Sequence, residues 1–101
     1  MISLTSNWKE FGSDVNRSLQ DDFCPQKYSG QDNIAKYLDA GTVLLVSPEC
    51  DVDVFTNERI KGTSNILTDG EYSWPSSLSY YVREYNLRLP AEFEKKAAKR
   101  S

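Results

Sequence analysis

Residues 66–85 read ILTDGEYSWPSSLSYYVREY, and this stretch carries the two clearest structural signals of the chain. In its first half, Ile66-Leu67 and Tyr72-Ser73-Trp74 stand on either side of Asp69-Gly70. Apolar and aromatic runs around an Asp-Gly pair are typical of a β-hairpin whose tight turn needs positive φ at both central residues. The sequence therefore predicts two antiparallel strands joined at Asp69-Gly70.

The second half of the stretch predicts a helix. Pro75 suits a first helical turn, where its missing N–H removes no hydrogen bond. Apolar side chains then recur with the i, i+3, i+4, i+7 spacing of one helix face, at Leu78, Tyr81, Val82 and Tyr85. Asn86 ends the pattern, and Tyr80, which lies off this face, is expected to be exposed.

A last helix is expected after Leu89-Pro90, over residues 91–100. Glu92 and Glu94 come early in it and four basic residues come late, an order that complements the helix dipole. Residues 91–101 thus read as a C-terminal helix with a basic tail.

Two more helices are predicted before residue 42. The first rests on a stripe of apolar residues at spacings of three, four and four, formed by Trp8, Phe11, Val15 and Leu19. The second begins at a pattern over residues 29–32 that resembles a capping box, presents Ile34, Tyr37 and Leu38 on one face, and stops at Gly41.

Two strands are predicted between residues 42 and 55. Residues 42–46 are a continuous β-branched and aliphatic run, as expected of a strand buried on both faces. Residues 49–55 alternate, with three carboxylates and Phe55 on one face and Cys50, Val52 and Val54 on the other. Together the patterns predict one α+β domain over residues 1–101, with a small antiparallel or mixed sheet packed with about four helices.

The charge of the chain is unevenly spread. Residues 1–90 carry 8 Lys/Arg and 13 Asp/Glu, hence 8 − 13 = −5, and residues 91–101 carry 4 and 2, hence +2, which gives the net −3. An acidic body disfavours nucleic acid as a direct partner, because phosphates are bound by clustered Lys/Arg. It favours a basic partner or simple solubility.

The expected location is the cytoplasm. The first ten residues lack the basic start and apolar run of a signal peptide. The longest apolar run, residues 43–46, is far shorter than the ~20 residues that cross a membrane. Cys24 and Cys50 are accordingly expected to be reduced thiols rather than a disulfide framework.

Few catalytic chemistries fit the composition. The chain has no histidine, which excludes Ser–His and Cys–His dyads and triads, and its five glycines are too dispersed for a phosphate-binding loop. Asp51 and Asp53 form an Asp-x-Asp pair that can hold Mg²⁺ or Ca²⁺ only if a third oxygen ligand converges on them. A solvated strand face and an acidic recognition strip are the other interpretations of the same pair, and we expect no catalytic residue, metal or cofactor.

The predicted partner-binding surface combines carboxylates with hairpin aromatics. Carboxylates can meet Lys or Arg of a partner, and Tyr and Trp are frequent anchors of binding hot spots, although hairpin aromatics equally often cover a core. The predicted set is Glu49, Asp51, Asp53, Asp69, Glu71, Tyr72 and Trp74.

Residues 67–93 resemble a known pattern. An Asp-Gly turn and an aromatic-x-Trp-Pro step lead into a Leu-x-Tyr-Tyr-Val-x-x-Tyr helix and a Leu-Pro-x-x-Phe ending. This stretch resembles immunity proteins of bacterial polymorphic or contact-dependent growth-inhibition toxin systems. The resemblance implies a cytosolic protein that binds and neutralises one cognate toxin domain, often a nuclease. We expect the chain to be a monomer when it is alone.

Two alternatives stay open beside this prediction. The first is a regulatory or phage-type inhibitor whose carboxylates mimic the phosphates of nucleic acid and which binds nucleic-acid enzymes. The second is a metal-dependent hydrolase built on Asp51 and Asp53.

Overall fold

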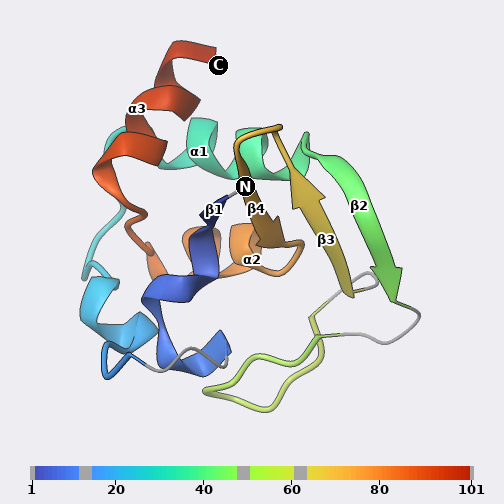
Figure 1. Cartoon of the computed structure of the whole chain (residues 1–101). Helices are drawn as coiled ribbons and strands as arrows, with labels where there is room; N and C mark the ends of the chain where they lie inside the picture. Colours follow the sequence, from blue (N-terminus) through green and yellow to red (C-terminus); the bar gives the residue numbers. More distant parts are fainter. Residues whose placement is uncertain (1, 12–14, 48–50, 61–63, 101) are drawn as a thin grey trace.

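A mixed four-stranded sheet organises the fold, as the computed structural model shows for residues 2–11, 15–47, 51–60 and 64–100 (Figure 1). Across the sheet the strand order is β1-β4-β3-β2. The strands are β1 (Ile2–Ser3), β2 (Thr42–Ser47), β3 (Ser64–Thr68) and β4 (Tyr72–Pro75). The pair β1/β4 is parallel, whereas β4/β3 and β3/β2 are antiparallel. The predicted α+β class is therefore confirmed.

The described residues contain three α-helices rather than about four, and α1 and α2 lie behind the sheet in the view of Figure 1. The helices are α1 (Gln31–Asp39), α2 (Leu78–Tyr85) and α3 (Ala91–Arg100). All three follow the predicted ranges closely. Asn86 caps α2 in the left-handed conformation, with φ 55°, whereas α1 starts at Gly30 without the side-chain cap that the capping box implied.

The predicted N-terminal helix is wrong. Its place is taken by short 3-10 turns, η1 (Leu4–Asn7), η2 (Lys9–Phe11) and η3 (Leu19–Asp22). Ser18 starts η3 with a reciprocal capping box to Asp21, which begins a new turn where the apolar stripe implied continuity. Trp8 and Leu19 still reach the core, but Val15 is exposed.

The hairpin is confirmed, but its turn differs from the prediction. Three residues, 69–71, connect β3 to β4, and of the two expected positive-φ residues only Gly70 has a positive φ, at 99°. The Asp69 carboxylate organises the loop instead, because it accepts the amides of Glu71 and Tyr72 at 2.9 and 2.8 Å. Pro75 ends β4 rather than opening α2.

Strand β2 overturns the expectation of a strand buried on both faces. It forms one edge of the sheet, at the right in Figure 1, and pairs only with β3 among the described strands. Its apolar side chains are 48% exposed at Val43 and Leu44, 66% at Leu45 and 71% at Val46. A continuous apolar run predicts a strand but cannot tell whether other elements cover it.

The junction between α1 and β2 is so tightly packed that it requires glycine. A Cβ on Gly41 would lie 2.7 Å from the Trp74 ring and 3.1 Å from the Leu67 Cβ. We expect Gly41→Ala to lower the free energy of unfolding by about 2 kcal/mol, because overpacking a core is destabilising.

Urea denaturation measures this change. Gly30→Ala is not a suitable control, because the φ of Gly30 is positive. Ala40→Gly at the adjacent exposed position is the better comparison, and equal effects of the two changes would contradict the prediction.

Candidate interaction surface

Residues 51–60 form a narrow ribbon rather than the predicted strand. The Asp53 amide donates to the Glu58 carbonyl and the Ile60 amide donates to the Asp51 carbonyl, each at 2.9 Å. Between them the chain turns back, with Asn57 at φ 63°. The expected alternation over residues 49–55 therefore ends at the turn, and Glu49 and Cys50 lie outside the described residues.

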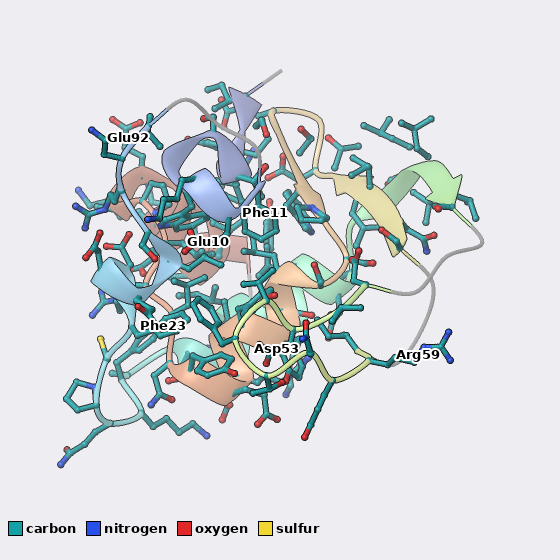
Figure 2. The ribbon with its side chains drawn as sticks, turned by 90° about the horizontal axis from the view of Figure 1, so that it is seen from below. Glu10, Phe11, Phe23, Asp53, Arg59 and Glu92 are labelled. Carbon is teal, nitrogen blue, oxygen red and sulfur yellow. The ribbon has the colours of Figure 1, made fainter. Side chains whose placement is uncertain are left out.

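Asp53, expected on an exposed acidic face, is fully buried (Figure 2). Its carboxylate accepts the hydroxyls of Tyr80 and Tyr85, from helix α2, at 2.7 and 2.6 Å. It also accepts the amides of Phe55 and Thr56, at 2.8 and 3.2 Å. Four donors satisfy this carboxylate, so Asp53 fastens the ribbon to α2, and Tyr80 is half-buried rather than exposed.

The electrostatics agree with this anchoring role. Burial raises the pKa of Asp53, but the hydrogen bonds from Tyr85, Tyr80 and the two amides outweigh burial, so the net effect is a lowered pKa. The hydrogen bond to Asp53, followed by burial, raises the pKa of Tyr85 to about 12 and also raises the pKa of Tyr80. The valines beside Asp53 take the outward positions, with Val52 43% and Val54 51% exposed.

Most of the predicted hairpin residues also point inward. Tyr72 and Trp74 are buried against Phe93 of α3, with ring centroids 5.1 and 5.5 Å apart. Asp69 accepts the Tyr37 hydroxyl at 2.6 Å and pairs with Lys96 at 3.0 Å. Glu71 remains exposed but also pairs with Lys96, at 3.1 Å.

These contacts hold Asp69 ionised. Burial raises its pKa, but the Tyr37 hydroxyl, the amides of Tyr72 and Glu71 and the Lys96 ammonium together lower it far below its usual value. The hairpin carboxylates are thus used to attach the β3–β4 loop to α1 and α3. The structure does not bring the predicted set together as one exposed surface.

An open groove does lie beside the ribbon, with a volume of about 770 Å³. It is bounded by the ribbon, by Asn65 of β3 and by one side of α2. Its charged lining residues are Asp39, Asp51, Glu58, Arg59, Arg83 and Glu84. Among the described lining residues, four carboxylates and two guanidinium groups give a net charge of 2 − 4 = −2.

Three of these carboxylates have no partner within the described chain. Arg83 pairs with Asp39 at 2.8 Å, whereas no described residue forms an ion pair or hydrogen bond with the side chains of Asp51, Glu58 or Glu84. Arg59 points away from the body of the molecule in Figure 2. Among the predicted site residues that the structure describes, Asp51 alone lines this groove.

Sequence reasoning missed Glu58 and Glu84. Glu84 lies on the polar side of α2, where a charged residue ordinarily reads as solvated. Glu58 lies beyond the turn from Asp51, and it comes to the same groove only because the ribbon folds back on itself. A turn signal at Asn57, a residue type that tolerates positive φ, was the one available clue.

The residues that the structure describes include no group of three or more Cys, Asp or Glu side chains placed to hold a metal ion. The Asp51/Asp53 pair in particular does not form, because Asp53 is enclosed by its four donors. Within the same described residues, no helix is both long and apolar enough to cross a membrane.

Comparison of the chain with protein-family models, with curated proteins and with solved structures finds no match.

Proposed function

We propose that this chain is a non-catalytic binding protein that neutralises a toxin domain by receiving its basic surface in the acidic groove. The observation that carries the proposal is a set of carboxylates around an open cavity, Asp51, Glu58 and Glu84, which no other described residue pairs with. The class of partner comes from the resemblance of residues 67–93 to bacterial immunity proteins.

The groove suits a protein segment that presents Lys or Arg. Carboxylates that already have internal partners gain little from a further cation, whereas Asp51, Glu58 and Glu84 have no such partner among the described residues. Complementary charges raise the association rate and select the orientation of a partner more than they raise affinity alone. The substrate channel of a nuclease is basic for the same reason that phosphate sites are, so it matches this groove.

The alternative of a nucleic-acid mimic shares the acidic groove and differs in its partner. The hydrolase alternative has lost the pair of carboxylates on which it was built, since Asp53 is satisfied inside the protein. The toxin-binding proposal is therefore the one that keeps both the geometry and the resemblance.

The test is capture followed by a growth assay. The tagged chain is used to purify its partner, and the captured protein is then expressed in bacterial cells with and without the chain. We expect the partner alone to arrest growth and the chain to restore it. A partner that is a housekeeping polymerase or restriction enzyme would instead favour mimicry, and a harmless partner would refute neutralisation.

Charge reversal in the groove tests the contact surface. We expect Glu58→Lys together with Glu84→Lys to raise the Kd for the partner at least tenfold, which corresponds to a loss of at least about 1.4 kcal/mol of binding free energy. Titration calorimetry at two salt concentrations measures this, and the variant should lose much of the salt dependence of the wild type.

Glu92→Lys is the matched control for each single reversal, Glu58→Lys or Glu84→Lys, because all three change the net charge by the same amount. Glu92 is an exposed glutamate of α3, is labelled in Figure 2 and does not line the groove. An equal loss of affinity in the control would show that overall charge, and not the groove, governs binding. Unchanged affinity in the double variant would move the interface elsewhere.

A further inference from the structure

Strand β2 changes its side-chain alternation at a bulge between Val43 and Leu45. Before the bulge Val43 pairs with Leu67 of β3, and after it Val46 pairs with Asn65. Directly opposite residues of an antiparallel pair point to the same face of the sheet. Leu67 and Asn65 share a face because they lie two positions apart. The extra residue of the bulge therefore brings Val43 and Val46 onto that one face.

This face is the one that packs on the helices elsewhere in the sheet. Leu67 is buried, and so is its partner Trp74 of β4, which donates its indole N–H to the Leu38 carbonyl of α1. Val43 and Val46 lie on the same face but are 48% and 71% exposed. The helices thus cover this face at β3 and β4 and leave the two valines of β2 open to solvent.

The two valines continue the wall of the acidic groove. Asn65, the β3 residue that lines the groove, lies directly opposite Val46. Cα atoms of such a pair are ~4.5–5.5 Å apart, so Val46 stands beside the groove and on its side of the sheet. Among the described lining residues Ile60 alone is aliphatic, and it is buried. The exposed aliphatic contact beside the groove is therefore offered by β2 and not by the groove itself.

The groove and the valines supply different parts of a binding free energy. The net negative charge of the described lining residues selects a cationic segment and its orientation. Ion pairs near the surface add little net affinity, whereas apolar contact stabilises a complex in proportion to the area that it buries. Single exposed valines are ordinary, but two on one face beside a charged groove form a continuous surface with both properties.

We infer that Val43 and Val46 are the apolar half of the partner-binding surface, and that the partner segment carries an aliphatic side chain close to Lys or Arg. The cationic side chain meets the carboxylates of Asp51, Glu58 and Glu84, and the aliphatic one covers the valines. This inference rests on the proposed function, since it takes the groove as the place where the basic segment binds. It adds an apolar requirement that a purely charged segment does not meet.

Two peptides that differ only in their apolar residues test the inference. The first, Lys-Ser-Leu-Ser-Lys-Ser-Leu-Ser-Lys, places leucine and lysine on the same side of an extended chain. The second has serine in place of both leucines and carries the same charge. We expect the leucine peptide to bind with a Kd about tenfold lower, because it buries apolar surface on the valines. The ratio of the two Kd values should be the same at low and high salt, since apolar contact is not screened.

Methyl NMR measures both Kd values and locates the contact. In a chain with labelled valine and leucine methyl groups, the leucine peptide should shift the signals of Val43 and Val46. Signals of Leu45 should move less, because Leu45 pairs with Ile66 and points to the other face. The serine peptide should leave the valine signals nearly unchanged.

Val46→Asp gives the sign of the effect. It removes apolar surface but adds a carboxylate beside the groove, so a purely electrostatic site would bind both basic peptides more tightly. We expect the Kd of the leucine peptide to rise at least about fivefold instead. Leu45→Asp is the matched control, since it makes the same charge change at an exposed position on the other face of the strand and should not weaken binding.

Circular dichroism reports on the fold of both variants. Val46→Thr keeps the branched shape and strand preference of valine, and it replaces Val46→Asp should that variant unfold. It should raise the Kd of the leucine peptide and leave that of the serine peptide unchanged.

Equal Kd values for the two peptides overturn the inference, as do equal effects of Val46→Asp and Leu45→Asp. Valine methyl signals that move with the concentration of the chain alone would assign this face to a second copy and overturn it as well. If the peptides bind equally and Glu58→Lys with Glu84→Lys weakens both, the acidic groove stands and only its apolar extension is wrong. If neither peptide binds at millimolar concentration, both are wrong. The growth assay tests neutralisation separately, because it uses the captured protein and not the peptides.

Discussion

Replacing Asp53 by alanine is expected to lower the free energy of unfolding by about 3 kcal/mol, because the change leaves several buried donors without an acceptor. The donors are the hydroxyls of Tyr80 and Tyr85, together with the amides of Phe55 and Thr56. Hydrogen bonds to a charged acceptor are stronger than neutral ones, and Asp53 has no exposed surface through which water can substitute. Urea denaturation at neutral pH measures the loss.

Asp51→Ala is the matched control, since it removes a carboxylate of the same ribbon that has no partner within the described chain. It should change stability by less than about 0.5 kcal/mol, as surface substitutions usually do. Tyr80→Phe and Tyr85→Phe each remove one donor and should be intermediate. Asp53→Ala and Asp51→Ala with equal effects would show that the Tyr–Asp–Tyr cluster contributes nothing particular.

The same cluster predicts how stability depends on pH. The folded pKa of Asp53 is lowered, so its contribution is present above the unfolded value near 3.8 and is lost as the pH falls through the folded pKa. The folded pKa of Tyr85 is raised to about 12, so its contribution is complete below its usual 10 and is lost as the pH rises between those values.

Unfolding free energies measured from pH 9 to pH 12 test the alkaline half. We expect the wild type to lose more stability than Tyr85→Phe over this range, because only the wild type carries this tyrosine proton. Parallel curves for the two proteins would show that the hydroxyl of Tyr85 is not held by Asp53 in solution.

The helices α1, α2 and α3 were predictable because their signals are local, whereas the apolar stripe of the N-terminal region did not produce an α-helix. The spacing of Leu78, Tyr81 and Val82 places them on one apolar face of the helix, and all three side chains are buried. The Asp-Gly pair fixed the place of the hairpin for the same reason. The turn type was not predictable, since the Asp69 side chain captures two amides and so stabilises a longer loop.

Tertiary context decided the remainder. Sheet order depends on which strands meet, so no local pattern showed that residues 42–47 would lie at an edge. The orientation of Asp53 depends on two tyrosines about thirty residues away, whose hydroxyls make burial of a carboxylate favourable. The alternating pattern correctly predicted that Asp53 and its neighbouring valines point to opposite sides. It did not predict which of the two sides is buried.

Replacing Trp74 by alanine is expected to lower the free energy of unfolding by about 4 kcal/mol, the usual scale for removing a buried tryptophan. Trp74 is 1% exposed, packs on Phe93 with ring centroids 5.5 Å apart, and donates its indole N–H to the Leu38 carbonyl at 3.1 Å. The ring thus joins β4 to α1 and α3, and its loss leaves a cavity where these three elements meet. Thermal and urea denaturation measure the change.

Trp74→Phe keeps most of the ring but not the N–H donor, so it should cost less, about 1–2 kcal/mol. The two variants also distinguish the two roles proposed for Trp74, core residue and interface anchor. If Trp74 is a core residue, its removal destabilises the protein and leaves the partner affinity of the folded fraction unchanged. If Trp74 is an interface anchor, its removal leaves the stability unchanged and weakens partner binding, because the ring of an anchor is buried only in the complex. Since the β3–β4 loop is already fastened to Lys96 and Tyr37, exposing Trp74 to a partner would require those contacts to break as well. A Trp74→Ala protein that keeps its stability but loses its partner would therefore imply that the hairpin opens on binding.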